Sequence, residues 1–405
     1  MSQTTREFFA EAVPTREMVD RFLDEHAHNW AVFDPELGYT LKSSTMRDGV
    51  DGSYTLTHYR PGGERHMVNY ARRPCRINTY GDSFTQCHQV SDGETWQEYL
   101  AAHLGEPVRN FGVGGYGVYQ AYRRMLREEA QHGAEYIVLN IWSDDHYRSV
   151  YRWRWLHIDG FRQRVSVRDA TETDAYMFHA NPWVHLRLDL ESGQYEGCEN
   201  PYSTPESLYL LCDAERACED FKGDFAVQAF LAQRQVADVD RGLLEEVAVA
   251  LEVPVDFSSP QATAATAREA LRVYALRASM YIVDWAQAFA QEEDREFMLL
   301  LSYSSRDVVA ACRGEERFDR ELVDYLDAGD FLYVDTLQKH VEDFSAFGCA
   351  AEDYVGRYYI GHYNPRGNHF FAFAVKDEVV EWLEPKPPTY REGGPSVRRT
   401  AAELA

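Results

Sequence analysis

Short apolar runs alternate along this sequence with amphipathic stretches of helical spacing, and this order constrains the fold more than any other feature. The runs lie at residues 75–80, around Val108, and at 134–142, 297–303 and 331–335. The run at 134–142 is apolar enough to be buried on both faces, as parallel strands between helices are. A succession of strand, helix and strand implies right-handed crossovers. We therefore predict an α/β fold with a doubly wound, five-stranded parallel sheet.

Apolar side chains at helical spacing predict the helices between and beyond these runs. The helix at 95–104 ends at Gly105, and a closing helix at 370–383 stops before Lys386-Pro387-Pro388. The other predicted helices lie at 15–28, 119–130, 220–234, 240–251, 262–291 and 318–326.

The chain is long enough for one elaborated domain. It has 405 residues, of which 45% are hydrophobic and 26% charged, so it can bury a full core. We predict an N-terminal extension packed on the core at 1–70, the core itself at 71–150 and 292–385, a large and mostly helical insertion at 151–291, and a loose tail at 386–405.

The charge balance argues against polyanionic partners. There are 41 Lys and Arg residues against 66 Asp and Glu, a formal charge of -25 that repels nucleic acids and anionic lipid surfaces. No apolar run approaches the roughly 20 residues that span a bilayer, and the N-terminus carries Glu7 and Glu11 where a secretory signal needs a basic start. We expect a cytoplasmic protein without a membrane partner.

The seven cysteines are scattered and include no Cys-x-x-Cys pair. Neither a disulfide framework nor a zinc knuckle is indicated, and reduced thiols are expected. His26 and His28 lie at a polar helix end, and no His, Asp or Glu cluster has the spacing of metal ligands. We therefore expect neither a metal nor another cofactor.

The first predicted strand ends at Gly81-Asp82-Ser83. A glycine there lets the chain turn sharply into a helix, and parallel strands deliver such residues to a crevice outside their carboxyl ends. Ser83 is thus a candidate nucleophile. Taken alone, the triplet indicates a surface turn, because all three residue types favour turns.

Three further segments follow it: Asn-Phe-Gly-Val-Gly-Gly-Tyr-Gly at 110–117, Ile-Val-Leu-Asn-Ile-Trp-Ser-Asp-Asp at 137–145, and Gly-His-Tyr-Asn-Pro-Arg-Gly-Asn at 361–368. In their order and placement the four segments resemble the SGNH (GDSL-like) hydrolases. The resemblance covers about 76–151 and 297–383 and leaves the long middle stretch unexplained. It implies a three-layer α/β/α sandwich of the flavodoxin-like, SGNH hydrolase type.

Acyl transfer needs a base within reach of the nucleophile, and His362 lies in a turn before the last helix. The resemblance implies the same role for His362, which precedes Asn364 in a His-x-Asn-x-x-Gly pattern, and we prefer it to His369. In the family an aspartate stands a few residues before the histidine, but here the nearest upstream acid is Asp353. A Ser-His dyad whose imidazole is held by a backbone carbonyl is the alternative.

For the oxyanion hole, the resemblance implies the backbone N–H groups of Ser83 and Gly115 and a side-chain amide at a position where Asp144 stands. An ionised carboxylate cannot donate a hydrogen bond. Either burial keeps Asp144 protonated, or Ser143 or Asn140 donates instead, or Asp144 contacts the substrate. The alternative is that Asp144 and its neighbour cap the following helix. The glycines at 112–117 lack the lysine and spacing of a phosphate-binding loop.

Other charged residues nearby are candidates for substrate binding, namely Asp82, Asp145 and Arg148. The run Tyr151-Arg152-Trp153-Arg154-Trp155 alternates aromatic and cationic side chains, which can stack on a sugar or hold a carboxylate. We favour the simpler interpretation, a half-buried strand with Trp153 and Trp155 inward and the two arginines in water.

Together these features predict a serine hydrolase, an SGNH-type esterase that cleaves a small acyl ester of a polar metabolite or sugar through a Ser83–His362 acyl-enzyme. Two alternatives stay open. An O-acyltransferase would pass the same acyl group to an acceptor other than water, and a catalytically impaired protein of this fold would only bind its ligand.

Overall fold

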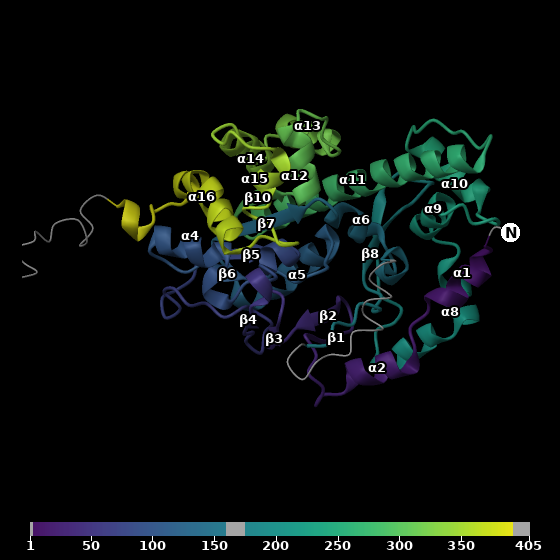
Figure 1. The fold of residues 1–405 in the computed structure, drawn as a ribbon, viewed down its shortest axis with the longest axis horizontal. Coiled ribbons are helices and arrows are strands. Elements are labelled where there is room, and N and C mark those ends of the chain that lie inside the picture. Colours follow the sequence, from purple (N-terminus) through teal and green to yellow (C-terminus); the bar gives the residue numbers. More distant parts are fainter. Residues whose placement is uncertain (1–2, 159–174, 392–405) are drawn as a thin grey trace, which may run out of the picture.

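A five-stranded parallel sheet lies at the centre of the computed structural model, which describes residues 3–158 and 175–391 (Figure 1). The strand order is β11-β10-β7-β5-β6, and every neighbouring pair is parallel. The strands are β5 (Ile77–Tyr80), β6 (Arg109–Asn110), β7 (Tyr136–Trp142), β10 (Glu296–Ser302) and β11 (Tyr333–Asp335). The predicted α/β fold with its five-stranded parallel sheet is confirmed.

The register of the sheet leaves one strand end recessed. Tyr80, the last residue of β5, pairs with Leu139, whereas β7 continues for three more residues to Trp142, which pairs with Ser302 of β10. The short helix α3 (Ser83–Gln86) packs beside this overhanging end of β7. The chain that leaves β5 is therefore held against the neighbouring strand at the carboxyl edge of the sheet.

Two groups of helices accompany the sheet. In one, α16 (Pro365–Trp382) contacts α4 (Trp96–Leu104) and α14 (Thr336–Phe344). In the other, α11 (Pro260–Glu292) contacts α5 (Val118–His132), α6 (Asp145–Val150) and α13 (Arg320–Ala328). The shorter helices α12 (Ser305–Cys312) and α15 (Ala351–Val355) pack together near α14.

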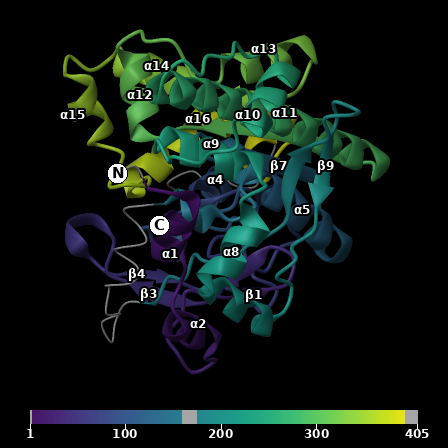
Figure 2. The ribbon, with the colours of Figure 1, turned by 90° about the vertical axis from the view of Figure 1, so that its right-hand side faces the viewer.

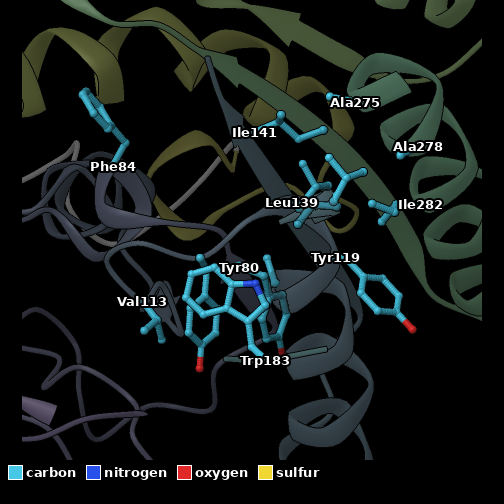
Figure 3. Close-up of a cluster of buried hydrophobic side chains, with 14 of the residues drawn as sticks. Tyr80, Phe84, Val113, Tyr119, Leu139, Ile141, Trp183, Ala275, Ala278 and Ile282 are labelled. Carbon is cyan, nitrogen blue, oxygen red and sulfur yellow. The ribbon is translucent and has the colours of Figure 1, made fainter. Parts of the chain in front are cut away.

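Small side chains let the long helix α11 lie close to the sheet. Figure 3 shows Ala275, Ala278 and Ile282 of α11 on the side where Leu139 and Ile141 project from β7. All five residues are buried, none more than 2% exposed. Burial of a leucine or isoleucine side chain stabilises a fold by about 1.5–3 kcal/mol. The apolar contact between α11 and β7 therefore holds the helix against the sheet.

The N-terminal part contributes two helices and two hairpins. These are α1 (Thr5–Ala12), α2 (Arg16–Leu23), β1 (Ala31–Asp34) with β2 (Gly38–Leu41), and β3 (Ser44–Met46) with β4 (Thr55–Thr57). The helix predicted over 15–28 ends at Leu23, because Asn29 donates to the carbonyls of Arg21 and Phe22 that would otherwise continue it. Trp30 and Tyr39 join the same hydrophobic core as the sheet.

The stretch before α11 is less regular than predicted. The helix expected over 220–234 is two helices, α8 (Ala214–Phe221) and α9 (Phe225–Gln233), because Asp224 caps a new helix by accepting from the Val227 N–H. An antiparallel hairpin, β8 (His185–Leu188) with β9 (Tyr195–Cys198), was not predicted. Figure 2 shows α9 and α10 (Arg241–Ala250) beside α11, and α8 near α1.

Within the described ranges, no helix combines the length and the apolar character needed to cross a bilayer.

Candidate active site

Ser83 is the first residue of α3, directly after the recessed end of β5. The turn requires glycine at position 81, where φ is +153° and a Cβ would stand 2.6 Å from the Asn140 carbonyl oxygen and also collide with Thr85. Asp82 caps α3 by accepting from the Phe84 N–H at 2.8 Å. Ser83 is thus fixed at the edge of the sheet, with 7% of its surface exposed.

His362 meets this serine across 279 positions of sequence. Its Nε2 lies 2.8 Å from Ser83 Oγ. The imidazole comes from the turn before α16, where Gly361 has φ +118° and a Cβ would lie 2.8 Å from Gln89 Oε1. His369, the alternative base, instead packs against Tyr99 on α4. The structure therefore brings together the two residues of the predicted pair.

Gln89 orients the imidazole. Its Oε1 accepts from the His362 backbone N–H at 2.8 Å and lies 3.1 Å from His362 Nδ1, and its Nε2 donates to the Asp48 carbonyl at 2.9 Å. Because the amide nitrogen is used by a carbonyl, the amide oxygen must face the ring, so Nδ1 carries the proton and Nε2 offers its lone pair to Ser83. A side-chain amide thus stands where we expected Asp353 or a backbone carbonyl.

Two residues between α3 and the Gln89 side chain adopt the left-handed backbone conformation. Cys87 ends α3 with φ +62°, and Gln89 has φ +72°. For residues other than glycine this conformation costs roughly 1–2 kcal/mol each. The double reversal carries the chain out of α3 and turns Gln89 back toward His362. No sequence pattern signals it, which is why the sequence analysis missed Gln89.

Burial lowers the pKa of His362 well below its usual range, and His88, Arg148 and Arg154 lower it further. The His88 ring lies 4.9 Å from the His362 ring, centroid to centroid, and its Nε2 is 3.2 Å from Asp48 Oδ2. Burial also lowers the pKa of His88, although Asp48 opposes the effect. His362 is therefore neutral at pH 7 and able to accept a proton.

On the serine side, Arg148 binds three carboxylates. Its Nη1 lies 3.2 Å from Asp82 and 2.9 Å from Asp145, and its Nε lies 3.0 Å from Asp144. Burial alone would lower the pKa of Arg148, but the three acids outweigh it and raise the pKa above its usual range. Burial, reinforced by Asp82, raises the pKa of Asp145 well above its ordinary value. Arg148 thus forms ion pairs with Asp82 and Asp145, whereas we predicted that all three residues bind substrate.

Two backbone N–H groups are free to serve an oxyanion. In the described part of the chain, neither the Ser83 N–H nor the Gly115 N–H donates to another protein group. Gly115 has φ +92°, and a Cβ there would lie 2.6 Å from Arg154 Nη1 and collide with the Tyr39 hydroxyl. Glycine at position 115 is therefore required by the fold.

The third predicted donor is absent from its expected position. Asp144 pairs with Arg148 through Oδ2, its side chain is 48% exposed, and it makes no capping bond to α6. Of the other candidates, Asn140 Nδ2 donates to Thr85 Oγ1 at 3.1 Å, and Ser143 Oγ accepts from the Ser304 N–H at 3.0 Å. Both side chains are used to join neighbouring segments of the sheet edge.

The aromatic and cationic run after α6 differs from its prediction. It forms a short 3-10 helix, η3 (Arg154–His157), and not a strand. Trp153 and Trp155 are buried as expected, but Arg154 Nη1 donates to the Gly115 carbonyl at 3.3 Å, and it does not simply face water. Sequence reasoning missed Arg154 because alternation at a spacing of two residues predicts a strand.

Within residues 3–158 and 175–391, no three His, Cys, Asp or Glu side chains gather as a metal site. No protein-family model matches the chain, and no curated protein does. Fold and site together define an α/β protein with a serine hydroxyl against a neutral imidazole. Function is therefore inferred from this chain's own residues.

Proposed function

We propose that this protein is a serine hydrolase of the SGNH (GDSL-like) type that cleaves a carboxylic ester. The observation that carries the proposal is the 2.8 Å approach of His362 Nε2 to Ser83 Oγ, with Gln89 placing the proton on the other ring nitrogen. The four sequence segments and the two groups of helices around the sheet support a three-layer α/β/α sandwich of this type.

In the proposed first step, Ser83 Oγ forms a bond to the ester carbonyl carbon while its proton moves to His362 Nε2. The carbonyl oxygen becomes an oxyanion that accepts from the Ser83 and Gly115 N–H groups. The bond from carbon to the alcohol oxygen then breaks, and that oxygen takes the proton from His362. Water repeats the sequence on the acyl-enzyme, which releases a carboxylic acid and restores Ser83.

The oxyanion hole of this mechanism holds two backbone donors, and each such donor is typically worth about 2.7–4 kcal/mol in the transition state. The imidazolium formed in the first step is stabilised by the Gln89 carbonyl oxygen, an uncharged acceptor.

An O-acyltransferase is the second candidate, because Ser83 lies buried where an acceptor alcohol can exclude water from the acyl-enzyme. Product analysis separates the two functions. Hydrolysis yields only free acid when an alcohol acceptor is added, whereas transfer yields the new ester in its place.

A fluorophosphonate probe tests the proposal directly. Mass spectrometry should find the label on Ser83, and both Ser83→Ala and His362→Ala should lose label and hydrolysis of a small chromogenic ester by about 10³-fold or more. Ser53→Ala, on an exposed turn, is the matched control and should react like wild type. An unlabelled but folded wild-type protein would reject the hydrolase and favour a protein that only binds its ligand.

A further inference from the structure

Among the described residues, Arg154 has no counter-ion, and it lies beside Gly115 of the proposed oxyanion hole. Its one hydrogen bond within the described residues runs from Nη1 to the Gly115 carbonyl at 3.3 Å. No described carboxylate lies within ion-pair distance of it, whereas its neighbour Arg148 has three. A guanidinium carries five N–H donors, so most of those of Arg154 are left for another partner.

The location of this guanidinium ties it to the proposed oxyanion donor. A Cβ at Gly115 would stand 2.6 Å from Arg154 Nη1. The charge of Arg154 also acts on His362, whose pKa it helps to lower. Arg154 is thus in contact with the proposed donor residue, and its charge reaches the proposed base.

The surroundings of Arg154 make its charge costly. Burial lowers the pKa of Arg154 to about 10, and Arg148 adds to the effect by repulsion, while Tyr39, Asp144 and Asp145 oppose it. A partly desolvated guanidinium gains most from a planar or tetrahedral anion that accepts two N–H bonds at once. Asp82 and Asp144 do not supply this anion, because Arg148 already engages them.

We propose that Arg154 binds an anionic group of the substrate, a carboxylate, phosphate or sulfate, and so selects esters that carry negative charge close to the bond that is cleaved. This inference rests on the proposed esterase function. It narrows the substrate class from polar esters in general to acidic ones, and it makes Arg154 a specificity-determining residue.

Matched ester pairs test the selection. Mono-4-nitrophenyl glutarate and its methyl ester differ in a carboxylate on the acyl side, and 4-acetoxybenzoate and its methyl ester differ in one on the alcohol side. Wild type should prefer the acid of one pair by about 10- to 100-fold in kcat/KM, mostly through a lower KM, because a charge-assisted hydrogen bond supplies that much. The pair that shows the preference identifies the side of the ester that faces Arg154.

Variants at position 154 identify the residue responsible. Arg154→Gln should abolish the preference for the acid, and Arg154→Lys should keep part of it, since lysine retains charge without the planar fork. Arg152→Gln is the matched control, because Arg152 lies two residues away and donates to the Asp220 carbonyl; its preference should stay at the wild-type value. Equal preference in wild type and Arg154→Gln would overturn the inference, provided that melting temperatures show both proteins folded.

A binding measurement separates this inference from the esterase proposal. Phosphate, sulfate or glutarate should raise the melting temperature of Ser83→Ala, which needs no catalysis, and should not raise that of the double variant with Arg154→Gln. If Ser83 resists the fluorophosphonate while this Arg154-dependent rise is present, the esterase fails and the anion site stands. If no anion produces such a rise and wild type prefers neither acid, the anion site fails.

Discussion

The two sides of the candidate site are held by different forces. On the serine side, Arg148 binds Asp82, Asp144 and Asp145 in one ionic cluster. On the histidine side, the uncharged amide of Gln89 receives both the backbone N–H and the ring of His362. Ion pairs thus hold the segment that carries the nucleophile, and the uncharged Gln89 amide orients the base.

This difference has a chemical consequence. A carboxylate beside an imidazole favours its protonated form and raises its pKa, whereas an amide oxygen does so only weakly. Burial therefore keeps His362 neutral, with no carboxylate to oppose it on the ring, and the imidazole remains ready to take the proton of Ser83. The carboxylates of Asp82, Asp144 and Asp145 lie on the serine side, where Arg148 compensates them.

Breaking the ionic side should have the largest effect. Arg148→Met leaves Asp82 buried without its cation, so we expect the free energy of unfolding to fall by about 3–5 kcal/mol. Urea denaturation measures the change. Arg152→Met is the control, because among the described residues Arg152 donates to a backbone carbonyl and to no carboxylate, and its loss should cost about 1 kcal/mol. Equal losses in the two variants would show that the cluster is no more stabilising than a single hydrogen bond.

Breaking the neutral side should affect activity more than stability. Gln89→Leu removes the acceptor that fixes the His362 tautomer, and kcat/KM for a neutral ester should fall by about 10²-fold or more. Gln89→Glu restores an acceptor and should recover part of the rate. A leucine variant as active as wild type would remove Gln89 from the mechanism.

The same Gln89→Glu variant also sharpens the comparison, because it places a carboxylate where the amide stands. The acid limb of its pH profile for kcat/KM should move to higher pH, since the new negative charge stabilises the imidazolium. Stopped assays from pH 4 to pH 8 measure the shift. An unchanged profile would mean that the residue at position 89 does not control protonation of the base.

In wild type, kcat/KM should stay nearly constant as the pH falls from 8 to about 6, because burial holds the pKa of His362 well below that of a free histidine, about 6.5. A half-maximal rate near pH 6.5 would contradict the depressed pKa. This effect is smaller than the first three, because it concerns the occupancy of one protonation state.

The stability of the fold should also fall with pH, but its loss begins at the pKa of a free histidine and not at the lower pKa of the folded protein. Below about pH 6.5, His362 and His88 bind protons in the unfolded chain but not in the folded protein, where their pKa values are lower. The free energy of unfolding therefore falls as the pH drops. Urea midpoints measured at pH 7.5 and pH 5.5 report the loss. His362→Gln should lose less over this interval, and a loss equal to that of wild type would exclude His362 as a contributor.

Much of the scaffold could be predicted from the sequence, because burial imposes regular patterns there. The strand β7 and the helix α11 have long periodic signals, and both lie within two residues of their predicted bounds. The hairpin of β8 and β9 and the break before α9 escaped prediction. They depend on tertiary contacts, such as the Tyr274 hydroxyl that accepts from the Leu188 N–H, and such contacts leave no local periodicity.

The site divides in the same way. Ser83, Gly115 and His362 follow from short motifs at the ends of predicted elements, and the structure places Ser83 against His362. Gln89 and Arg154 could not be found by motif. The role of Gln89 depends on a left-handed backbone at position 89, and that of Arg154 on a 3-10 turn that carries it to Gly115. Both are consequences of chain geometry and not of residue type.

The Asp48 carbonyl that accepts from Gln89 has a wider consequence. It belongs to the loop between β3 and β4, so the first sixty residues supply the far end of the chain of bonds that sets which ring nitrogen of the histidine bears hydrogen. A shortened protein that starts after this hairpin would retain both reacting groups in its sequence and lose the anchor that aligns them. The N-terminal hairpin thus helps to orient His362 through Gln89, although it supplies no group that contacts the ester.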